Sequence, residues 1–465
     1  MFAGFMLVDR CWKSTRSSAS TLLTLAPVHN SITGNHAVTE DNRELDARKA
    51  TYGGPLKNWA GNVTFSATQL HRPRSVAELQ HVVARSVRIR ALGSGHSFSR
   101  VADASGDLVT TEALHIGVDF DESEGTATVP AGARYSDIVA TLHARGRALP
   151  NLGSLPHIVI AGAAATGTHG SGDRNKCLAA AVVGMQFVGA DGELVTIARQ
   201  DDGFAGSALA LGALGVATRL TLATQPAFDL RQHVWHDASL NSVLDHFDEI
   251  MGSGYSVSLL SWPQRRDVID QIWIKSRAET EPADGTMWGA RAATEPAHPV
   301  AGLDARAASP QLGQRLPWYE VLPHFRASFT PSSGDEQQTE YLIPRQHGPA
   351  AVAALQQLDL TDALQVMEIR TVAADDLWLS PAYGRDSVAA HFTWHNRDAA
   401  VLHACAQVER ALDRFEPRPH WGKIFSLDPQ RVRDSYPRLT DFQQLAARHD
   451  PNRKFGNQFL SDFIY

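Results

Sequence analysis

The sequence predicts a two-domain α+β fold, and three observations along its first half support the fold class. Residues 75–83 carry apolar side chains at helical spacing behind a Ser-x-x-Glu capping box. Residues 87–92 and 126–129 are short apolar runs typical of strands, and a helical segment over residues 137–145 ends at a glycine. Helices that alternate with strands in this way indicate helices packed on a sheet.

A β-hairpin is predicted farther along the chain. Asp191-Gly192 separates two apolar runs, residues 185–190 and 193–198, and an Asp-Gly pair favours the tight turn of a hairpin. We expect the first domain to span residues 55–226 and to end soon after this hairpin.

The rest of the chain is expected to form a second domain and an N-terminal extension. Residues 227–465 mix short strands with helices and show no internal repeat. Between residues 280 and 316 the composition shifts to Pro, Ala, Gly and Glu, which predicts a long loop that helps to shape the entrance of a site. Residues 1–54 are expected to be a disordered extension or the result of a start codon placed too far upstream.

Composition narrows the class of protein. The chain has 465 residues, with 43% hydrophobic and 20% charged side chains, as in ordinary soluble proteins of two or three domains. The net charge of −7 without a long basic run argues against a nucleic-acid surface and fits a neutral substrate. No apolar stretch approaches the ~18 residues of a membrane span, so we expect a soluble protein. The three widely spaced cysteines are consistent with a reducing compartment, and we expect the cytoplasm.

Two glycine-rich segments are the strongest local signals. Residues 93–97 read Gly-Ser-Gly-His-Ser, and glycine there lets the backbone adopt positive φ and approach a ligand while the histidine offers a nucleophilic nitrogen. Residues 162–172 supply small side chains and hydroxyls along which a pyrophosphate can lie, because bare N–H groups bind anions. We interpret the first segment as a cofactor anchor.

Neither glycine-rich segment matches a familiar nucleotide fingerprint. Phe98 stands where the G-x-G-x-x-G pattern needs its last glycine, and residues 162–172 lack the Gly-Lys-Ser/Thr ending of a P-loop. Both the Rossmann and the P-loop interpretations are therefore weakened. Each segment alone also fits an ordinary tight turn.

Residues 364–372 form an apolar run with two embedded charges. If the run is a strand, its alternation puts Glu368 and Arg370 on one face and Met367 and Ile369 on the core face. A carboxylate beside a guanidinium can hold a vicinal diol through an acceptor and a donor. Considered alone, the tripeptide also fits a structural ion pair on the surface.

The alternation of a strand also places His391, Thr393 and His395 on one face. The two histidines would be spaced for a metal if the segment were helical, but no thiolate or suitably placed carboxylate completes a site. The three cysteines, Cys11, Cys177 and Cys405, are widely spaced and predict neither a zinc site nor a disulfide framework. We therefore expect no metal.

Two further polar residues have candidate roles. Lys423 follows His-Trp-Gly and can direct an ammonium at developing negative charge, while its apolar neighbours predict partial burial rather than a solvated surface lysine. Ser154 can hydrogen-bond a ligand or stabilise a turn, and it lacks the Gly-x-Ser-x-Gly context of a hydrolase nucleophile.

Taken together, the ordered blocks of this chain resemble the vanillyl-alcohol oxidase type of flavoprotein and, within it, the alditol oxidase branch. The resemblance runs from about residue 58 to the C-terminus. It is carried by residues 58–62, 93–98, 150–157, 165–170, 338–342, 368–371, 380–386, 391–394 and 420–423. It implies a domain that binds FAD and a second domain that binds the substrate.

The resemblance also implies roles for individual residues. The histidine that matches His96 is bonded to the 8α-methyl of FAD. The other residues implied to contact the cofactor are Gly93, Ser94, Gly95, Ser97, Ser154, Val159, Gly162, Thr166, Gly167, Thr168, His169, Gly215 and Val216. The substrate pocket is implied to contain Ser154, Gln338, Glu368, Arg370, His391, Thr393 and Lys423, with Arg370 and Lys423 polarising the reacting hydroxyl. Gly153 matches a small residue that opens a route for oxygen.

The activity implied is transfer of a hydride from the primary alcohol of a polyol such as xylitol or sorbitol to FAD, which dioxygen reoxidises with release of hydrogen peroxide. An aldonolactone oxidase, acting on D-arabinono-1,4-lactone or L-gulono-1,4-lactone, is the nearest alternative. Residues 391–394 favour the alditol branch, whereas residues 420–422 are closer to the lactone pattern. A non-catalytic protein that keeps the flavin fold is the alternative of another class.

Overall fold

The computed structural model describes residues 55–114, 116–280, 287–329 and 334–465, all of which lie in one compact unit that spans residues 52–465. The expected N-terminal extension, residues 1–54, lies outside the described residues, as does part of the loop predicted between residues 280 and 316. No helix in the described ranges is long and apolar enough to cross a membrane.

A small parallel sheet opens the described chain. Its strands are β1 (Gln69–His71), β3 (Asp107–Val109) and β2 (Ile89–Ala91), in that order. The helix predicted after residue 75 is confirmed as α2 (Val76–Arg85), and the Ser75 hydroxyl accepts the N–H of Glu78 at 3.2 Å. The predicted capping box is shifted by one residue, because the Glu78 carboxylate accepts the N–H of Arg74 and not that of Ser75.

An antiparallel five-stranded sheet follows. Its order is β4 (Asp119–Asp121), β5 (Thr126–Pro130), β9 (Val216–Ala223), β7 (Val182–Val188) and β8 (Leu194–Ala198). The predicted hairpin is confirmed as β7 and β8, and Gly192 in its turn has a φ of +89°. The segment predicted as a helix over residues 137–145 is α3 (Tyr135–Ala144).

The short elements of this half lie in the connections between its strands. They are η1 (Arg100–Ala102), β6 (Arg147–Ala148), α4 (Ile160–Ala165), η2 (Leu178–Ala181), α5 (Phe204–Ser207) and β10 (Gln225–Pro226). Helix α4 begins the second glycine-rich segment, so the turn after it carries Thr166 and Thr168. The N–H of Val159, just before α4, donates to the Ser94 hydroxyl and so joins the two glycine-rich regions.

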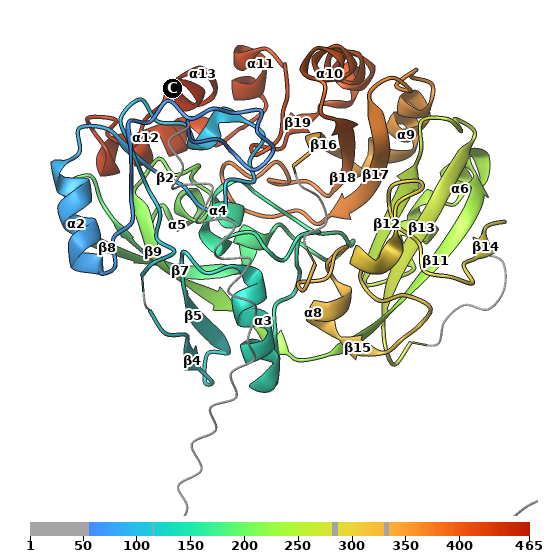
Figure 1. Cartoon of the computed structure of the whole chain (residues 1–465), viewed down its shortest axis with the longest axis horizontal. Coiled ribbons are helices and arrows are strands. Elements are labelled where there is room, and N and C mark those ends of the chain that lie inside the picture. Colours follow the sequence, from blue (N-terminus) through green and yellow to red (C-terminus); the bar gives the residue numbers. More distant parts are fainter. Residues whose placement is uncertain (1–54, 115, 281–286, 330–333) are drawn as a thin grey trace, which may run out of the picture. The chain divides into compact units, whose positions relative to one another are not determined.

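The second half is built on a nine-stranded antiparallel sheet. Its strands are β11 (Asp229–Ser239), β12 (Ser256–Ser261), β13 (Val268–Arg277), β14 (Arg291–Ala292), β15 (Leu316–Pro317), β16 (Glu336–Pro344), β17 (Leu364–Val372), β18 (Ser387–His395) and β19 (Arg418–Pro419). Their order is β14-β11-β13-β12-β17-β18-β16-β19, with β15 on β11. Figure 1 shows this sheet to the right of the five-stranded sheet.

Helices pack around the large sheet and close the C-terminal part of the fold. They are α6 (Leu240–Asp245), α7 (Phe247–Gly252), α8 (Trp318–Val321), α9 (Gly348–Gln356), α10 (Asp398–Leu412), α11 (Pro429–Asp434), α12 (Leu439–His449) and α13 (Gln458–Phe463). Helices α9 and α10 contact one another along one side of the sheet (Figure 1). Short 3-10 turns lie at η3 (Ala305–Ala307), η4 (Arg345–His347) and η5 (Asp413–Phe415).

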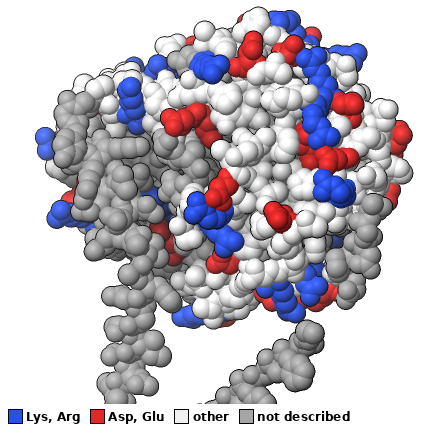
Figure 2. Space-filling view, turned by 45° about the vertical axis from the view of Figure 1, so that its right-hand side comes forward, with Lys and Arg blue, Asp and Glu red and all other residues white. Residues whose placement is uncertain are grey.

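One apolar core joins the two sheets, since buried residues such as Val129 of β5, Leu259 of β12 and Ile369 of β17 belong to a single cluster. The polypeptide passes from the first sheet to the second between β9 and β11. The predicted boundary at residue 226 lies in this connection, and the division into two domains stays a prediction. On the face shown in Figure 2, acidic and basic side chains are interspersed.

Candidate active site

A cavity of about 600 Å³ lies where the glycine-rich segments meet the large sheet. Its volume is in the range of small-molecule and cofactor sites. One side, here called the glycine-rich wall, is made by lining residues within 91–102, 158–169 and 211–217. A second part of the lining, here called the polar wall, is made by side chains of β16, β17 and β18 and of residues 420–423.

The glycine-rich wall is centred on the turn that follows β2. Gly95 has a φ of +68°, and its carbonyl accepts the N–H of Trp59 at 2.9 Å. The imidazole of His96 lies beside the indole of Trp59, with 4.9 Å between ring centroids and a tilt of 32°. The Ser94 hydroxyl accepts the N–H of Val159 at 3.3 Å, which joins this turn to the start of α4. The histidine is therefore held at the cavity by contacts from two other segments.

The second glycine-rich segment continues the same wall. A Cβ built on Gly162 would meet no atom within 4 Å, so the backbone there borders open space. The hydroxyls of Thr166 and Thr168 lie 3.3 Å apart. The predicted cofactor residues that line the cavity are Gly93, Ser94, Gly95, His96, Ser97, Ser154, Val159, Gly162, Thr166, Thr168, His169 and Gly215.

Two predicted cofactor residues take other positions. Gly167 and Val216 are not among the described residues that line the cavity. A Cβ on Gly167 would lie 3.1 Å from Leu209 and 3.2 Å from Pro381, so that glycine permits close packing beneath the wall. Val216 is fully buried in a small core under β2 and α2. Their contact with the cofactor stays a prediction.

The glycine-rich wall fits a flavin dinucleotide. Small side chains leave the backbone accessible along it, and its hydroxyls can donate to phosphate or ring oxygens. A cation also lies at this wall: Arg90 lines the cavity, and its buried guanidinium donates to the carbonyls of Val101 and Leu211, both at 2.6 Å. Burial lowers the pKa of Arg90 to about 10, so it remains charged at neutral pH. Sequence analysis missed Arg90 because a lone arginine in a short strand carries no motif.

Strand β17 brings the predicted charge pair to the polar wall. Glu368 and Arg370 are buried and line the cavity, while Met367 and Ile369 lie in the main core. The predicted alternation is therefore confirmed, and the alternative of a surface ion pair is wrong. The pair itself is loose, with Arg370 Nε 3.7 Å from Glu368 Oε1. A different carboxylate is the closer partner of Arg370.

That carboxylate belongs to Glu340 of β16. Arg370 Nη2 donates to Glu340 Oε1, and Nε2 of His169 and Nδ1 of His391 lie 3.3 and 3.4 Å from the two carboxylate oxygens. Burial opposes ionisation of Glu340, but Arg370 and the two histidines outweigh burial and hold its pKa well below the ordinary value. Glu340 therefore remains a carboxylate at the centre of the polar wall.

Sequence analysis missed Glu340 although the signal was present. Glu336, Gln338 and Glu340 share one face of β16 under the same alternation that identified Glu368 and Arg370. Of these, only Gln338 is among the predicted site residues. In the structure the Gln338 amide donates to Glu336 at 2.6 Å and its oxygen accepts from the ammonium of Lys423.

Strand β18 adds a histidine and a hydroxyl to the polar wall. The Nε2 of His391 lies 3.3 Å from the Thr393 hydroxyl, and both side chains line the cavity. The alternate residues Phe392 and Trp394 are fully buried on the other face and stack at 5.2 Å, as the alternation predicted. Burial lowers the pKa of His391, which favours its neutral form.

Lys423 reaches the cavity from a loop that is fastened to the glycine-rich wall. The Phe98 N–H donates to the Gly422 carbonyl at 2.7 Å, and the Ser99 hydroxyl donates to the Trp421 carbonyl at 2.6 Å. Lys423 itself is half-buried, as predicted, and its Nζ lies 5.1 Å from the Phe98 ring centroid. Burial lowers the pKa of Lys423 to about 8.

Ser154 and the predicted entrance loop complete the cavity. The Ser154 hydroxyl accepts from Arg370 Nη1 at 3.4 Å, so it faces the polar wall in addition to lying in a turn. His298, Pro299, Val300 and Leu303, which belong to the loop predicted between residues 280 and 316, line the cavity. The role of this loop at the entrance of the site stays a prediction.

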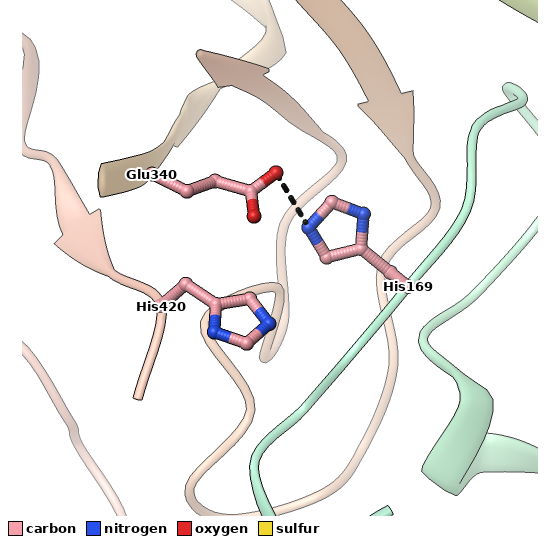
Figure 3. A group of neighbouring side chains, drawn as sticks. All are labelled: His169, Glu340 and His420. Carbon is pink, nitrogen blue, oxygen red and sulfur yellow. Dashed lines mark ion pairs between the residues drawn. The ribbon is translucent and has the colours of Figure 1, made fainter. Parts of the chain in front are cut away.

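A metal is disfavoured at the one cluster of possible ligands in the described part of the chain. His169, Glu340 and His420 are buried, with one ligand atom of each within 4.8 Å of the others (Figure 3). Arg370 donates to the same Glu340 carboxylate, and its guanidinium would repel a second cation at that position. His391 and His395, the pair weighed from the sequence, lie on a strand and not on a helix.

Comparison with known proteins places this geometry among flavoprotein oxidases. A family profile described as FAD binding domain matches residues 67–198, and one described as D-arabinono-1,4-lactone oxidase matches residues 335–463. The chain is 47% identical over 415 residues to alditol oxidase of Streptomyces sp. (strain IKD472 / FERM P-14339), an alignment that covers 88% of this chain and 99% of the relative.

Among the more distant relatives are proteins that are named for lactone substrates. L-gulono-1,4-lactone dehydrogenase of Mycobacterium tuberculosis is 31% identical, with 86% of this chain and 97% of the relative covered. Two solved structures share the fold: cholesterol oxidase from B. sterolicum, with a TM-score of 0.71 at 13% identity over 88% and 96% of the two chains, and a chitooligosaccharide oxidase, with 0.69 at 12% over 89% and 94%. These two likenesses concern the fold alone.

Proposed function

The chain belongs to the family of FAD-dependent oxidoreductases that includes alditol oxidase, and we propose that it oxidises the primary alcohol of an alditol such as xylitol or sorbitol. The overall reaction joins one alditol and one dioxygen to give one aldose and one hydrogen peroxide. One observation carries this proposal: a wall suited to FAD and a wall of buried, hydrogen-bonding side chains enclose a single cavity.

The residues proposed to hold FAD are those of the glycine-rich wall. His96 would bind FAD covalently through an imidazole nitrogen. The indole of Trp59, which lies beside this imidazole, would fix the plane of the imidazole ring. When bound, FAD supplies the acceptor for the hydride and passes the electrons to dioxygen. A permanent attachment prevents the cofactor from dissociating between turnovers.

The polar wall is proposed to bind and polarise the polyol. Arg370 and Lys423 are the cations that draw electron density from the reacting hydroxyl. The ionised Glu368, the hydroxyls of Ser154 and Thr393, and the amide of Gln338 hold the remaining hydroxyls. The neutral form of His391, favoured by its burial, offers a ring nitrogen that can accept a proton from a substrate hydroxyl.

The experiment that tests the cofactor proposal needs no substrate. After denaturing electrophoresis and an acid soak, the protein band is expected to fluoresce under ultraviolet light. His96→Ala is expected to abolish this fluorescence even if FAD stays bound in the native protein, and His71→Ala, outside the cavity, serves as the matched control. A fluorescent His96→Ala band would contradict attachment through His96.

Substrate choice is tested by measuring peroxide release with xylitol, sorbitol and L-gulono-1,4-lactone. We expect turnover with the two alditols. The second candidate, an aldonolactone oxidase, is supported by the profile that matches residues 335–463, and a clear preference for the lactone would favour it. A yellow protein that no polyol or lactone bleaches without oxygen would favour a non-catalytic flavin-binding protein instead.

A further inference from the structure

A buried lysine lies outside the residues that line the cavity. Lys275 of β13 is 1% exposed, and its Nζ is surrounded by three acceptors. It donates to the carbonyls of Leu322 at 2.6 Å and Pro323 at 3.1 Å, and it lies 3.4 Å from Nδ1 of His324. An ammonium has three N–H donors, so these three acceptors match its full donor set.

His324 connects this lysine to the cavity. Its ring stacks on Trp273 of β13, with centroids 5.2 Å apart and planes 18° from parallel. Its Nε2 lies 2.8 Å from Oε1 of Glu368, and neither atom has another hydrogen-bond partner among the described residues. The two atoms are at hydrogen-bonding distance, and the contact helps to hold the pKa of Glu368 well below its ordinary value. Two buried polar atoms thus depend on each other.

The backbone of the same segment fastens a second substrate residue. The N–H groups of His324 and Phe325 both donate to the Ser154 carbonyl, at 3.1 and 3.3 Å. The hydroxyl of Ser154 faces Arg370 at 3.4 Å. Residues 322–325 therefore connect β13 to two groups of the polar wall, and Lys275 binds this segment at its first two carbonyls.

We propose that Lys275 and His324 are positioning residues for Glu368, which rests on the proposed function because Glu368 is taken to bind the polyol. An ammonium at Lys275 leaves Nδ1 of His324 as an acceptor, so the single proton of the neutral ring sits on Nε2. That N–H faces Glu368 and holds one carboxylate oxygen. The carboxylate is thereby kept in one orientation toward the cavity.

The charges around His324 and Lys275 determine the pH range in which this arrangement exists. His324 faces Lys275 on β13 and Glu368 and Arg370 on β17, and burial lowers its pKa to about 4. Lys275 faces Glu368 and Arg370 as well, and burial lowers its pKa to about 7. Near pH 6, His324 is therefore neutral while Lys275 is an ammonium, which is the combination the arrangement needs.

Kinetics with xylitol test the positioning role. His324→Phe keeps the ring on Trp273 but removes the N–H, and its KM is expected to rise on the order of tenfold to a hundredfold with a smaller change in kcat. His324→Gln restores a donor and is expected to recover most of the affinity. His233→Phe, on β11 of the same sheet and outside the cavity, is the control. An unchanged KM in His324→Phe would overturn the proposal.

A second measurement does not depend on turnover. In protein labelled with ¹⁵N-histidine at about pH 6, the signal lost in His324→Gln is assigned to His324, and its shifts are expected to report the Nε2–H tautomer. Lys275→Met is expected to release this tautomer into a mixture. A His324 that carries its proton on Nδ1 in the unmodified protein would overturn the proposal, even if no polyol proves to be a substrate.

Discussion

At the scale of single residues, the site depends on buried charges, each of which lies near groups that stabilise it. Glu340 and Glu368 stay ionised because Arg370 and neighbouring histidines outweigh the cost of burial. The pKa of Arg370 is raised, because the two carboxylates outweigh the burial that opposes its charge. Each of these side chains therefore has its charge fixed by oppositely charged or hydrogen-bonding partners, most of which lie on other segments of the chain.

Lys423 is expected to limit activity at high pH. Its pKa is lowered to about 8 by burial, and only the ammonium can polarise the reacting hydroxyl, so kcat at saturating xylitol should be flat below about pH 7 and fall above about pH 8. Peroxide release measured from about pH 6 to about pH 10 checks this.

The variant Lys423→Arg tests whether Lys423, and not another titrating group, causes the fall in activity at high pH. Arginine keeps its proton throughout the range, so the fall above about pH 8 should disappear in this variant, even if the maximal rate is lower. Lys454→Arg, a lysine beneath α2 that lies outside the cavity, is the matched control. An identical alkaline fall in Lys423→Arg would show that another group titrates.

Glu340→Gln is expected to impair both stability and substrate binding. The variant removes the anion that Arg370 contacts, and loss of one partner from a buried ion pair costs about 3–5 kcal/mol of unfolding free energy. With its guanidinium free to turn toward Glu368, Arg370 should bind the reacting hydroxyl less well, and kcat/KM should fall on the order of a hundredfold.

Urea unfolding followed by tryptophan fluorescence and peroxide kinetics measure the two effects of Glu340→Gln. The matched control is Glu336→Gln, because Glu336 shares the same face of β16 but contacts Gln338 and not Arg370. Equal effects of the two variants would contradict a special role for Glu340.

At the scale of elements, β17 shows how one strand serves two environments. Its even-numbered residues Glu368 and Arg370 line the cavity, and the odd-numbered Met367 and Ile369 pack in the core. The neighbours β12 and β18 pair with it on either side, so its register is fixed. A shift of one residue would bury the charges in the core and expose the apolar side chains to the cavity.

Substitutions on the two faces of β17 should therefore change different properties: stability on the core face and substrate binding on the cavity face. Ile369→Ala is expected to lose about 2–5 kcal/mol of unfolding free energy with kcat/KM of the folded enzyme nearly unchanged. Glu368→Gln should raise the KM for xylitol about tenfold or more with a smaller loss of stability. Urea unfolding and steady-state kinetics on both variants make the comparison. A large rise in the KM for xylitol in Ile369→Ala, without one in Glu368→Gln, would contradict this division between the two faces.

At the scale of the whole described unit, contacts between distant segments assemble the cavity. The Gly172 N–H donates to the Thr371 carbonyl at 2.9 Å, joining the second glycine-rich segment to β17. The contacts of Phe98 with Gly422 and of Ser154 with Arg370 cross the cavity elsewhere. The site therefore forms only when both sheets are in place.

The buried charges predict how stability depends on pH. Glu340 and Glu368 have pKa values well below the ordinary value in the folded protein. At pH values above the carboxylate pKa of the unfolded chain, these two groups therefore stabilise the folded protein. This stabilisation is lost as the pH falls. The lowered pKa of His324 acts in the same direction, because the unfolded chain binds its proton first.

Unfolding free energy is thus expected to fall as pH drops from about 6.5 to about 4. Urea unfolding at several pH values, followed by tryptophan fluorescence, measures the slope. Glu368→Gln should give a shallower slope than the unmodified protein, whereas Glu249→Gln, an exposed carboxylate on α7, should leave it unchanged. Stability that is constant or rises toward low pH would contradict the assignment.

Local pattern was enough to predict the mixed fold, the helix after residue 75, the β7–β8 hairpin and the two faces of β17 and β18. These features depend on spacing along a single segment, where periodicity and turn residues decide the structure. The composition of the two glycine-rich segments predicts a cofactor anchor, and both segments line the cavity.

Only the tertiary structure decided which partners the buried charges have. Arg370 contacts Glu340, 30 residues away in sequence, more closely than its neighbour Glu368, and the pairing follows from strand order in the large sheet. Arg90, Lys275 and His324 carry no motif, because their acceptors are main-chain carbonyls and side chains supplied by other segments. A sequence specifies which faces are polar, but the strand order and packing of the folded chain determine which polar groups meet.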